Sequence, residues 1–283
     1  RRVTGVQTCA LPILKTIFSL PADVWKNRRL VLKLAKNDFK TKYAGSYLGA
    51  VWALIQPIVT ILVYWFVFSV GVKPSMGGVD VPFVLYLVAG IVPWFFFQDS
   101  LNGGTNALIE YNYLVKKVVF NISVLPIVKI ISALFVHCFF VAFTIILYMF
   151  YGRFPDVYYL QILYYSFCTF VLVLGLCYAT CAIVVFFRDL TQIISIGLQV
   201  GIWLTPIMWV AETALKDHPM LHRVLQLNPM YYIVSGYRDA FVTKQWFVEH
   251  PYWTLYFWVF TILCFLLGSW VFKRLRVHFA DVL

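Results

Sequence analysis

The chain has 283 residues and a formal net charge of +11; 62% of its residues are hydrophobic and only 12% are charged. Soluble domains average about 45–50% apolar and about 25% charged residues. This composition argues against a soluble enzyme, a disordered chain and a secreted disulfide scaffold. We therefore expect an all-α polytopic membrane protein.

The first residues, 1–14, read RRVTGVQTCALPIL and lack the long apolar core of a signal peptide. We expect this stretch to be a non-native leader, with the native protein beginning near Leu14 or Lys15. Residues 15–47 are then a cytoplasmic N-terminal segment.

A predicted amphipathic helix lies just before the first apolar run, in RRLVLKLAKNDFKTKY. Leu30, Leu34 and Ala35 recur at helical spacing, and lysines occupy much of the remaining surface. This pattern is typical of an interfacial helix lying flat on the inner leaflet. Two roles stay open for it: a simple membrane anchor, or a surface on which a cytoplasmic partner acts.

Six apolar runs are candidates for spanning helices, which need about 20 mostly apolar residues. They lie at about 48–72, 81–97, 124–151, 157–187, 190–210 and 253–272. Residues 48–272 thus form a predicted six-span transmembrane domain. Prolines within or beside these runs are expected to mark kinks or helix ends.

The basic residues predict the orientation of these spans. With both termini in the cytoplasm, 17 Lys and Arg residues lie inside and 6 lie outside, while the acidic residues divide evenly. The whole positive excess is then cytoplasmic. We attribute it to topology and to contact with anionic membrane lipids, and we expect no nucleic acid as a partner.

Three connecting segments are too polar or too interrupted to span. Residues 102–121 are expected to form a cytoplasmic coupling loop, and Arg188–Asp189 a short charged hairpin. Residues 211–252 are expected outside, as short re-entrant or interfacial helices before the last span, because Ile233, Tyr237 and Phe241 fall at helical spacing. Residues 273–283 form a predicted cytoplasmic tail.

Motifs for nucleotide and metal chemistry are absent from the sequence. It contains no GxxxxGK[ST], no HExxH and no GxSxG, so it has no phosphate loop of its own. The six cysteines show no zinc spacing with a histidine, and we expect no metal site. His137 is the one imidazole within a predicted span, and we interpret it as hydrogen-bonded to a neighbouring helix.

Six ordered sequence blocks together resemble a known family. The blocks are NDFKTKYAGSYLGAVWALIQP (37–57), GIVPWFFF (90–97), LVKKVVFNISVLP (114–126), FFRDLTQI (186–193), LTPIMW (204–209) and NPMYYIVSGYRDAF (228–241). The chain resembles the type-2 ABC exporter permeases that move polysaccharides, although many members have Pro where Asn121 stands. Within this family, YWFVFSVGVK (64–73) is most similar to the members that translocate wall teichoic acid.

The resemblance implies a function and a set of partners. Such permeases form homodimers in the bacterial cytoplasmic membrane and recruit two copies of a separate ABC ATPase, which holds the ATP and Mg; no cofactor is expected in this chain. The substrate is a polyprenyl-diphosphate-linked polysaccharide, here wall teichoic acid. ATP-driven closure of the partners is transmitted through the interfacial helix and the 102–121 loop.

This mechanism, taken with the residue pattern, predicts three groups of site residues. The ATPase-interface and coupling group comprises Arg28, Arg29, Lys33, Lys36, Asp38, Lys40, Glu110, Lys116, Lys117, Arg188 and Asp189. The candidate channel aromatics are Tyr64, Trp65 and Trp94. The outer gate group comprises Asn228, Pro229, Tyr231, Tyr237 and Arg238, and for Arg238 we favour a structural role over phosphate contact.

Two alternative functions remain open at this level. One keeps the transport class but changes the cargo to lipid-linked O-antigen or capsular polysaccharide. The other is a membrane-embedded glycosyl- or acyltransferase, which would depend on His137 or Asp99. The scarcity of acidic residues near the span ends argues against catalysis.

Overall fold

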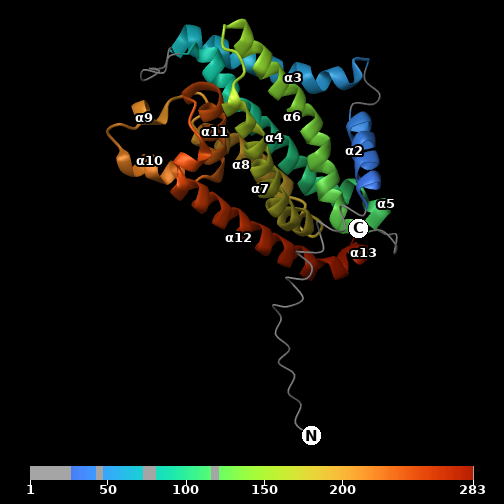
Figure 1. The fold of residues 1–283 in the computed structure, drawn as a ribbon. Helices are drawn as coiled ribbons and strands as arrows, with labels where there is room; N and C mark the ends of the chain where they lie inside the picture. The colour runs from blue at the N-terminus through green and yellow to red at the C-terminus, as the bar shows by residue number, and fades with distance from the viewer. Residues whose placement is uncertain (1–26, 43–46, 73–80, 116–120, 283) are drawn as a thin grey trace, which may run out of the picture.

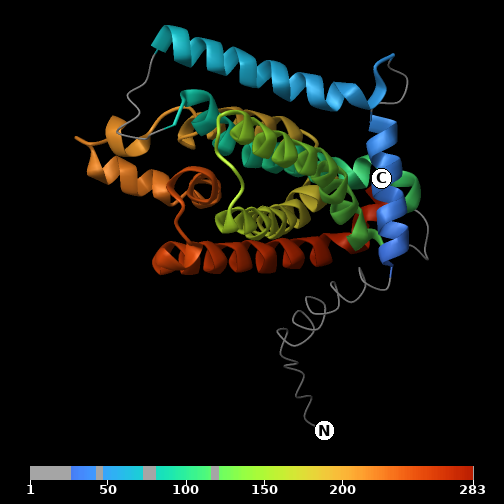
Figure 2. The ribbon, with the colours of Figure 1, turned by 45° about the horizontal axis from the view of Figure 1, so that its top comes forward.

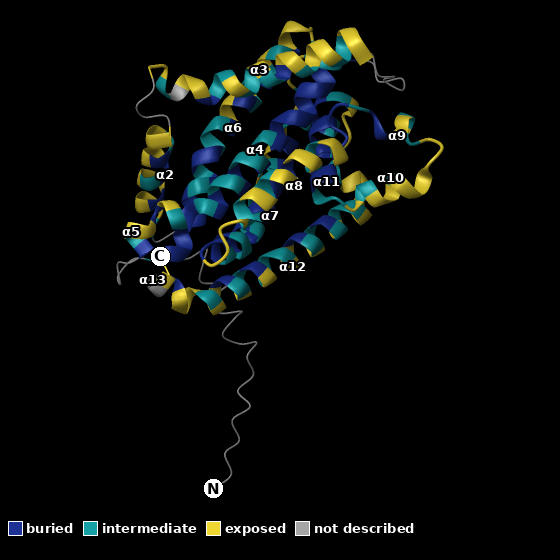
Figure 3. Ribbon diagram, turned by 180° about the vertical axis from the view of Figure 1, so that it is seen from behind, coloured by how far each residue is buried: buried dark blue, intermediate teal, exposed yellow. Residues whose placement is uncertain are grey.

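The computed structural model describes residues 27–42, 47–72, 81–115 and 121–282, and these residues contain helices and no strands. Three helices form the centre of the bundle: α4 (Phe83–Glu110), α6 (Leu125–Phe150) and α7 (Gln161–Val184). The long helix α12 (Pro251–Leu275) packs along α7, and α3 (Trp52–Phe66), extended by a π-helix at Val67–Val72, lies on the opposite side of the bundle (Figure 1, Figure 2). Burial is deepest along α4, and much of α3 is exposed (Figure 3). The expected all-helical membrane architecture is confirmed.

Two glycines allow α7 and α12 to approach closely. A Cβ added to Gly268 would lie 2.1 Å from the Gly175 carbonyl oxygen, and one added to Gly175 would lie 2.9 Å from the backbone of Phe265. Small residues at helix crossings let backbones pack tightly in a membrane, where apolar burial alone gives little drive for association. These glycines therefore allow the close packing of α7 on α12.

Five described helical segments are long and apolar enough to cross a membrane, so the expected count of six is not confirmed. They are Trp52–Val72, Phe83–Glu110, Ile122–Phe150, Val157–Val184 and Pro251–His278. The expected fifth span is α8 (Leu190–Leu204), with only 15 residues. At 1.5 Å per residue it is about 22 Å long, shorter than a hydrocarbon core of about 30 Å. Residues 205–210, which follow it, are not helical.

Helix α4 continues well beyond the expected end of the second span at residue 97. It runs to Glu110 and is followed by the short helix α5 (Asn112–Val115), so the first part of the expected 102–121 loop is helical. Asp99, Asn102, Asn106 and Glu110 recur every three or four residues, which puts them on one face of the helix. This face meets other polar groups of the protein. The second half of α4 therefore stays helical although it is less apolar than the first half.

Helix α2 (Arg28–Lys42) lies across one end of the bundle and packs against α6 (Figure 2). Its buried residues are Val31, Ala35 and Asp38. The expected amphipathic helix is thus present, but its buried face includes Val31 in place of Leu30, which is 43% exposed. The expected apolar face was therefore wrong in that position, because Val31 is the residue in register with Ala35.

The segment before the last helix is a series of short helices at the other end of the bundle. They are α9 (Ala211–Ala214), α10 (Pro219–Gln226), α11 (Pro229–Arg238), a π-helix at Asp239–Thr243 and a 3-10 turn at Phe247–Glu249. Ile233, Tyr237 and Phe241 are all buried, as their spacing predicts, and α11 packs against α4 and α7. A Cβ on Gly236 would lie 1.9 Å from the ring of Tyr165, so α11 is in direct contact with α7.

The C-terminal residues return to the end of the bundle where α2 lies. After α12, a 3-10 turn (Arg276–His278) and α13 (Phe279–Val282) complete the described chain. The buried Phe279 ring lies 5.6 Å from that of Phe272 and 6.2 Å from that of Phe186, between centroids. The predicted tail is therefore helical as far as Val282, and its Phe279 is packed.

Candidate functional site: a polar cleft beneath α2

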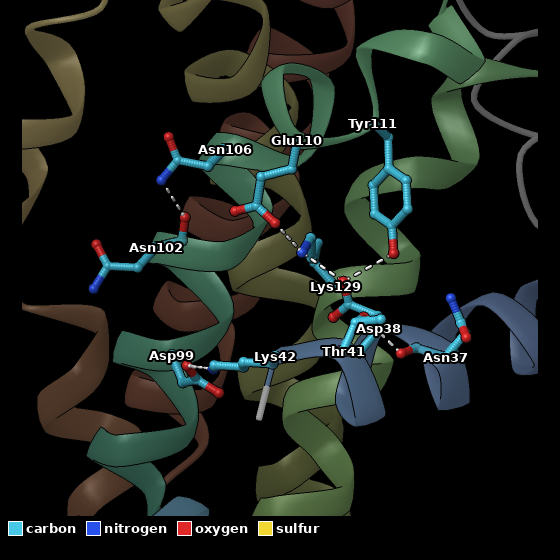
Figure 4. A network of polar contacts seen from close by, with 10 residues as sticks. All are labelled: Asn37, Asp38, Thr41, Lys42, Asp99, Asn102, Asn106, Glu110, Tyr111 and Lys129. Carbon is cyan, nitrogen blue, oxygen red and sulfur yellow. Dashed lines mark hydrogen bonds and ion pairs between the residues drawn. The ribbon is translucent and has the colours of Figure 1, made fainter. Parts of the chain in front are cut away.

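A cleft of about 400 Å³ lies between α2, α4 and α6. Its lining is mainly polar or charged and comprises Asp38, Thr41, Lys42, Asp99, Asn102, Gly103, Asn106, Glu110, Lys129, Ser132 and Ala133. We call it the polar cleft. It exists because α4 directs its polar face, and α2 its one buried carboxylate, into the same space (Figure 4).

Lys129 of α6 is at the centre of the polar cleft. Its Nζ lies 2.5 Å from Oδ1 of Asp38 on α2 and also pairs with Glu110 at the end of α4. Side-chain exposure is 10% for Lys129 and 8% for Asp38. A buried charge is costly unless it is paired and hydrogen-bonded. One ammonium group therefore connects three helices (Figure 4).

Tyr111 completes this network from the residue after α4. Its hydroxyl donates to Asp38 Oδ1 at 2.8 Å, and Lys129 Nζ lies 5.2 Å from the centroid of its ring. Burial raises the pKa of Tyr111, and the hydrogen bond to Asp38 raises it further. The phenol therefore stays protonated and remains a donor to the carboxylate.

A second ion pair joins α2 to α4, and its α2 residue lies one helical turn after Asp38. Lys42 Nζ lies 2.5 Å from Asp99 Oδ1, with both side chains about two-fifths exposed. Farther along α4, the Asn106 side chain accepts a hydrogen bond from Thr191 Oγ1 of α8 at 3.2 Å. The polar face of α4 therefore contacts α2, α6 and α8.

A larger cavity of about 640 Å³ adjoins the polar cleft and extends between α3, α4, α6 and α8. The two spaces share Lys42, Asp99, Asn102 and Ala133. The larger one is lined by aromatic residues that include Trp52, Tyr64, Phe95, Phe96, Phe140 and Trp203. We call it the aromatic cavity. The polar cleft can contact a polar group of a ligand, and the aromatic cavity can contact a hydrocarbon or the apolar face of a sugar.

The three candidate channel aromatics occupy different surroundings. Tyr64 lines the aromatic cavity, whereas Trp65 is 41% exposed on α3. Trp94 is buried, its indole donates to Gln98 Oε1 at 3.2 Å, and a Cβ on Gly201 would lie 2.8 Å from its ring. Tyr64 is thus the member of this group that the structure places on a cavity.

Most described members of the coupling group are exposed at the end of the bundle that carries α2. Exposed side chains are found at Arg28, Arg29, Lys33, Lys36, Lys40, Glu110, Arg188 and Asp189. The Arg188–Asp189 turn lies at this end because Phe186 packs against Phe279. Asp38 differs, since its carboxylate is buried in the polar cleft. Lys116 and Lys117 lie outside the described residues, and the role of the whole group stays a prediction.

The outer gate group belongs mainly to α11. Asn228 caps this helix by accepting from the Met230 amide at 3.0 Å, and its side chain donates to Thr205 Oγ1 at 2.9 Å. Pro229 occupies the first turn, and Tyr231 is buried beneath α10. The segment is therefore tied to the end of α8.

Two further members of the outer gate group point into the bundle. Tyr237 shares a hydrogen-bonded cluster with His137 and Ser166, at 2.9 Å and 2.7 Å. Arg238 donates to the Ile207 carbonyl at 2.8 Å, and its guanidinium lies 3.7 Å from the centroid of the Tyr86 ring. Arg238 is therefore held within the protein, and the role predicted for the outer gate group stays a prediction.

His137 and Asp99, on which a transferase would depend, both line the aromatic cavity but have separate partners. His137 Nε2 is hydrogen-bonded to Ser166 and Tyr237 hydroxyls, and its ring stacks on Phe96 at 4.5 Å. Asp99 is paired with Lys42. Within the described ranges, no three His, Cys, Asp or Glu side chains are grouped to hold a metal ion. His137 and Asp99 therefore line the same cavity without pairing with each other.

The sequence contained an unused signal for the polar cleft. The i, i+3, i+7, i+11 spacing of Asp99, Asn102, Asn106 and Glu110 predicts a polar helical face, although we assigned the last three to a loop. Lys129 was not among the predicted site residues. Its pairing with Asp38, 91 residues earlier, has no local signature.

Comparison with known proteins gives the family. An O-antigen export system permease protein RfbA of Myxococcus xanthus is 27% identical over 262 residues, which cover 93% of this chain and 98% of the relative. A protein of the same name from Klebsiella pneumoniae is 24% identical over 259 residues, covering 90% and 95% of the two chains. The family model for ABC-2 type transporters matches residues 29–242. The chain belongs to the ABC-2 type transporter family, as a membrane subunit.

Proposed function

We propose that the chain is the permease subunit of an exporter of lipid-linked polysaccharide, powered by a separate ATPase subunit. The observation that carries this proposal is the similarity to O-antigen export permeases along nearly the whole length of both chains. Similarity confined to one apolar helix would be weak support. Here the similarity covers 93% of this chain and 98% of the Myxococcus xanthus relative, so it includes the short outer helices and the interfacial helix.

The two ends of the bundle support a division of labour with an ATPase. One end of the bundle carries the basic side chains of α2, together with the end of α4 and the Arg188–Asp189 turn. Such a charged, exposed surface suits the docking of an intracellular ATPase. The sequence contains no phosphate loop, so ATP and Mg would be held by the partner. In our account this end is cytoplasmic, both termini lie in the cytoplasm, and the membrane is the bacterial cytoplasmic membrane.

Helix α3 supports assembly of two permease copies with two ATPase subunits. Only 11% of the most apolar window of the Trp52–Val72 segment is buried within the chain, against 78% for Phe83–Glu110. Leu62, Val63 and Phe66 are more than half exposed. Because α3 also forms one wall of the aromatic cavity, a second copy packed here would close a path between protomers.

For the cargo, we propose a polysaccharide of the O-antigen type. The expectation of wall teichoic acid finds no support among these relatives, which export O-antigen by name. The short YWFVFSVGVK resemblance was a weak basis for choosing a polymer, since most of its apolar residues are those any spanning helix needs. Capsular polysaccharide remains in the same transport class.

The proposal is tested with proteoliposomes that contain the chain with or without a co-expressed ABC ATPase. We expect ATP-dependent translocation of a fluorescent polyprenyl-diphosphate-linked neutral glycan only when both proteins are present. A glycan linked to polyol phosphate should move more slowly. Nucleotide hydrolysis by the isolated chain, or faster transport of the phosphate-rich polymer, would contradict the proposal.

A further inference from the structure

The short helices that precede α12 lie at the end of the bundle opposite α2 (Figure 1). A third cavity, of about 320 Å³, lies among them. It lies against α7 and is bounded by α9, α10, α11, the Asp239–Thr243 π-helix and the first turn of α12. We call it the outer pocket. Its volume is at the low end of the range for ligand pockets, about 300–1,000 Å³, so it suits a small ligand group.

Two carboxylates give the outer pocket its charge. Glu212 is exposed and accepts a hydrogen bond from the Tyr231 hydroxyl at 3.4 Å, while Asp239 Oδ1 accepts from Thr243 Oγ1 at 2.7 Å. Burial raises the pKa of Asp239, because its ionised form is poorly solvated. Such a carboxylate gains stability from any further hydroxyl or amide donor that enters the pocket.

Aromatic rings provide the remaining walls of the outer pocket. Tyr165, Tyr231, Tyr232 and Trp253 all line it. Tyr232 is held in place by stacking on Phe257 at 4.9 Å and by a hydrogen bond between its hydroxyl and that of Thr254 at 2.9 Å. The Tyr232 ring is therefore held in place before a ligand arrives, which lowers the entropic cost of binding.

Carboxylates among fixed aromatic rings favour a ligand with many hydroxyl donors and apolar C–H faces. A neutral pyranose has both: its hydroxyls donate to Asp239 and Glu212, and its C–H face stacks on a ring such as Trp253. Among the described residues, the lining contains neither lysine nor arginine, and its basic side chain is the imidazole of His250. A phosphate would therefore meet two carboxylates and no ammonium or guanidinium partner. A metal ion is disfavoured too, because no group of three ligating side chains occurs in the described ranges.

We infer that the outer pocket is a binding subsite for an uncharged sugar residue of the polysaccharide, which it contacts as the polymer leaves the permease. This inference rests on the proposed function and deepens it, because a carboxylate-lined subsite would select neutral sugars over polyol phosphates. It lies within one protomer, behind α11, and is separate from the aromatic cavity.

Binding at equilibrium tests the inference without ATP or transport. The full chain in lipid nanodiscs is titrated with short neutral oligosaccharides and with oligomeric polyol phosphate, and saturation-transfer NMR reports contact with the sugar protons. The variants Asp239→Asn and Trp253→Leu keep the size or the apolar character of the side chain. Asp217→Asn is the matched control, because Asp217 is exposed in the same segment and is absent from the lining.

We expect the neutral oligosaccharide to bind more tightly than the polyol phosphate, and each lining variant to weaken its binding by about tenfold or more. Asp217→Asn should bind as the unmodified chain does. Equal binding of the two polymers, or the same loss in Asp217→Asn as in Asp239→Asn, would overturn the inference. Circular dichroism and gel filtration of each variant separate a lost contact from a lost fold.

Failure of the subsite inference can be told apart from failure of the proposed transport function. Sugar binding that depends on Asp239, in a chain that fails to export with any ATPase, would support the subsite while contradicting the transport role. ATP-driven export with binding unchanged in Asp239→Asn and Trp253→Leu would support the transport role and overturn the subsite.

Discussion

Buried charges are held in opposite ways at the two ends of the bundle. Beneath α2, the Lys129 ammonium lies between the carboxylates of Asp38 and Glu110. At the other end, Arg238 is only 8% exposed, yet its partners are the Ile207 carbonyl and the face of the Tyr86 ring. The buried charge of Lys129 is thus held by ion pairs, and that of Arg238 by a backbone oxygen and an aromatic ring.

This difference indicates how each end can behave. Paired charges can separate and re-form when α2 moves, because each group has a defined opposite partner. Arg238 instead anchors the segment after α8 to α4 and α11, and it is enclosed so tightly that a Cβ on Gly90 would lie 2.9 Å from its Nη2. We therefore interpret the α2 end as the part that moves with a motor and the Arg238 contact as a fixed point.

The largest expected effect comes from breaking the central ion pair. Lys129→Met leaves the Asp38 carboxylate buried with its Tyr111 donor but without its cation, and we expect a loss of about 3–5 kcal/mol in the free energy of unfolding. Unfolding by SDS in mixed micelles, followed by circular dichroism, measures it.

Asp38→Asn in the Lys129→Met background is the control for this prediction. The double variant should be less destabilised than the sum of the single variants, with a coupling energy of about 1–3 kcal/mol. Strict additivity would show that the Asp38–Lys129 pair is not an interacting unit.

A smaller effect is expected at the opposite end. Arg238→Met removes the contact with the Tyr86 ring and the hydrogen bond to Ile207, but it leaves no unpaired carboxylate behind, so we expect a loss of about 2 kcal/mol. Arg238→Lys keeps the charge and should recover only part of this loss, because an ammonium lacks the planar face that stacks on the ring. A loss as large as that of Lys129→Met would remove the contrast between the two ends.

The smallest effect is expected for the second ion pair of α2. Lys42 and Asp99 are 44% and 38% exposed, and exposed pairs contribute about 0–1 kcal/mol. Lys42→Met should therefore leave the free energy of unfolding within about 1 kcal/mol of the unmodified chain. If Lys42→Met lost more free energy of unfolding than this, and lost the same amount at low and at high salt, the pair would be part of the buried network.

The apolar elements were predictable from the sequence because hydropathy reports them directly. The runs at 81–97, 124–151, 157–187 and 253–272 each fall on a long helix of the structure. The polar half of α4 was missed because a hydropathy criterion ends a span at its first polar residues. The helical spacing of Asp99 and Asn102 carried the missing information.

The candidate site was only partly predictable. Asp38 was included in the coupling group from its position among lysines, yet it is in register with Val31 and Ala35 on the buried face of α2. A carboxylate on an apolar face predicts a buried partner, but no local pattern says which one. Lys129 is far away in sequence, so only the packing of α2 on α6 identifies it.

The most direct test of the central claim is ATP-driven translocation of a lipid-linked neutral glycan in proteoliposomes, compared between the unmodified chain and Lys129→Met, each with its ATPase subunit. We predict export by the unmodified pair and none by the chain alone. We also predict that Lys129→Met slows export relative to ATP hydrolysis, because the ion pairs that join α2 and α4 to α6 through Lys129 are lost. Export by the chain without an ATPase, or no export by the complete pair, would contradict the account.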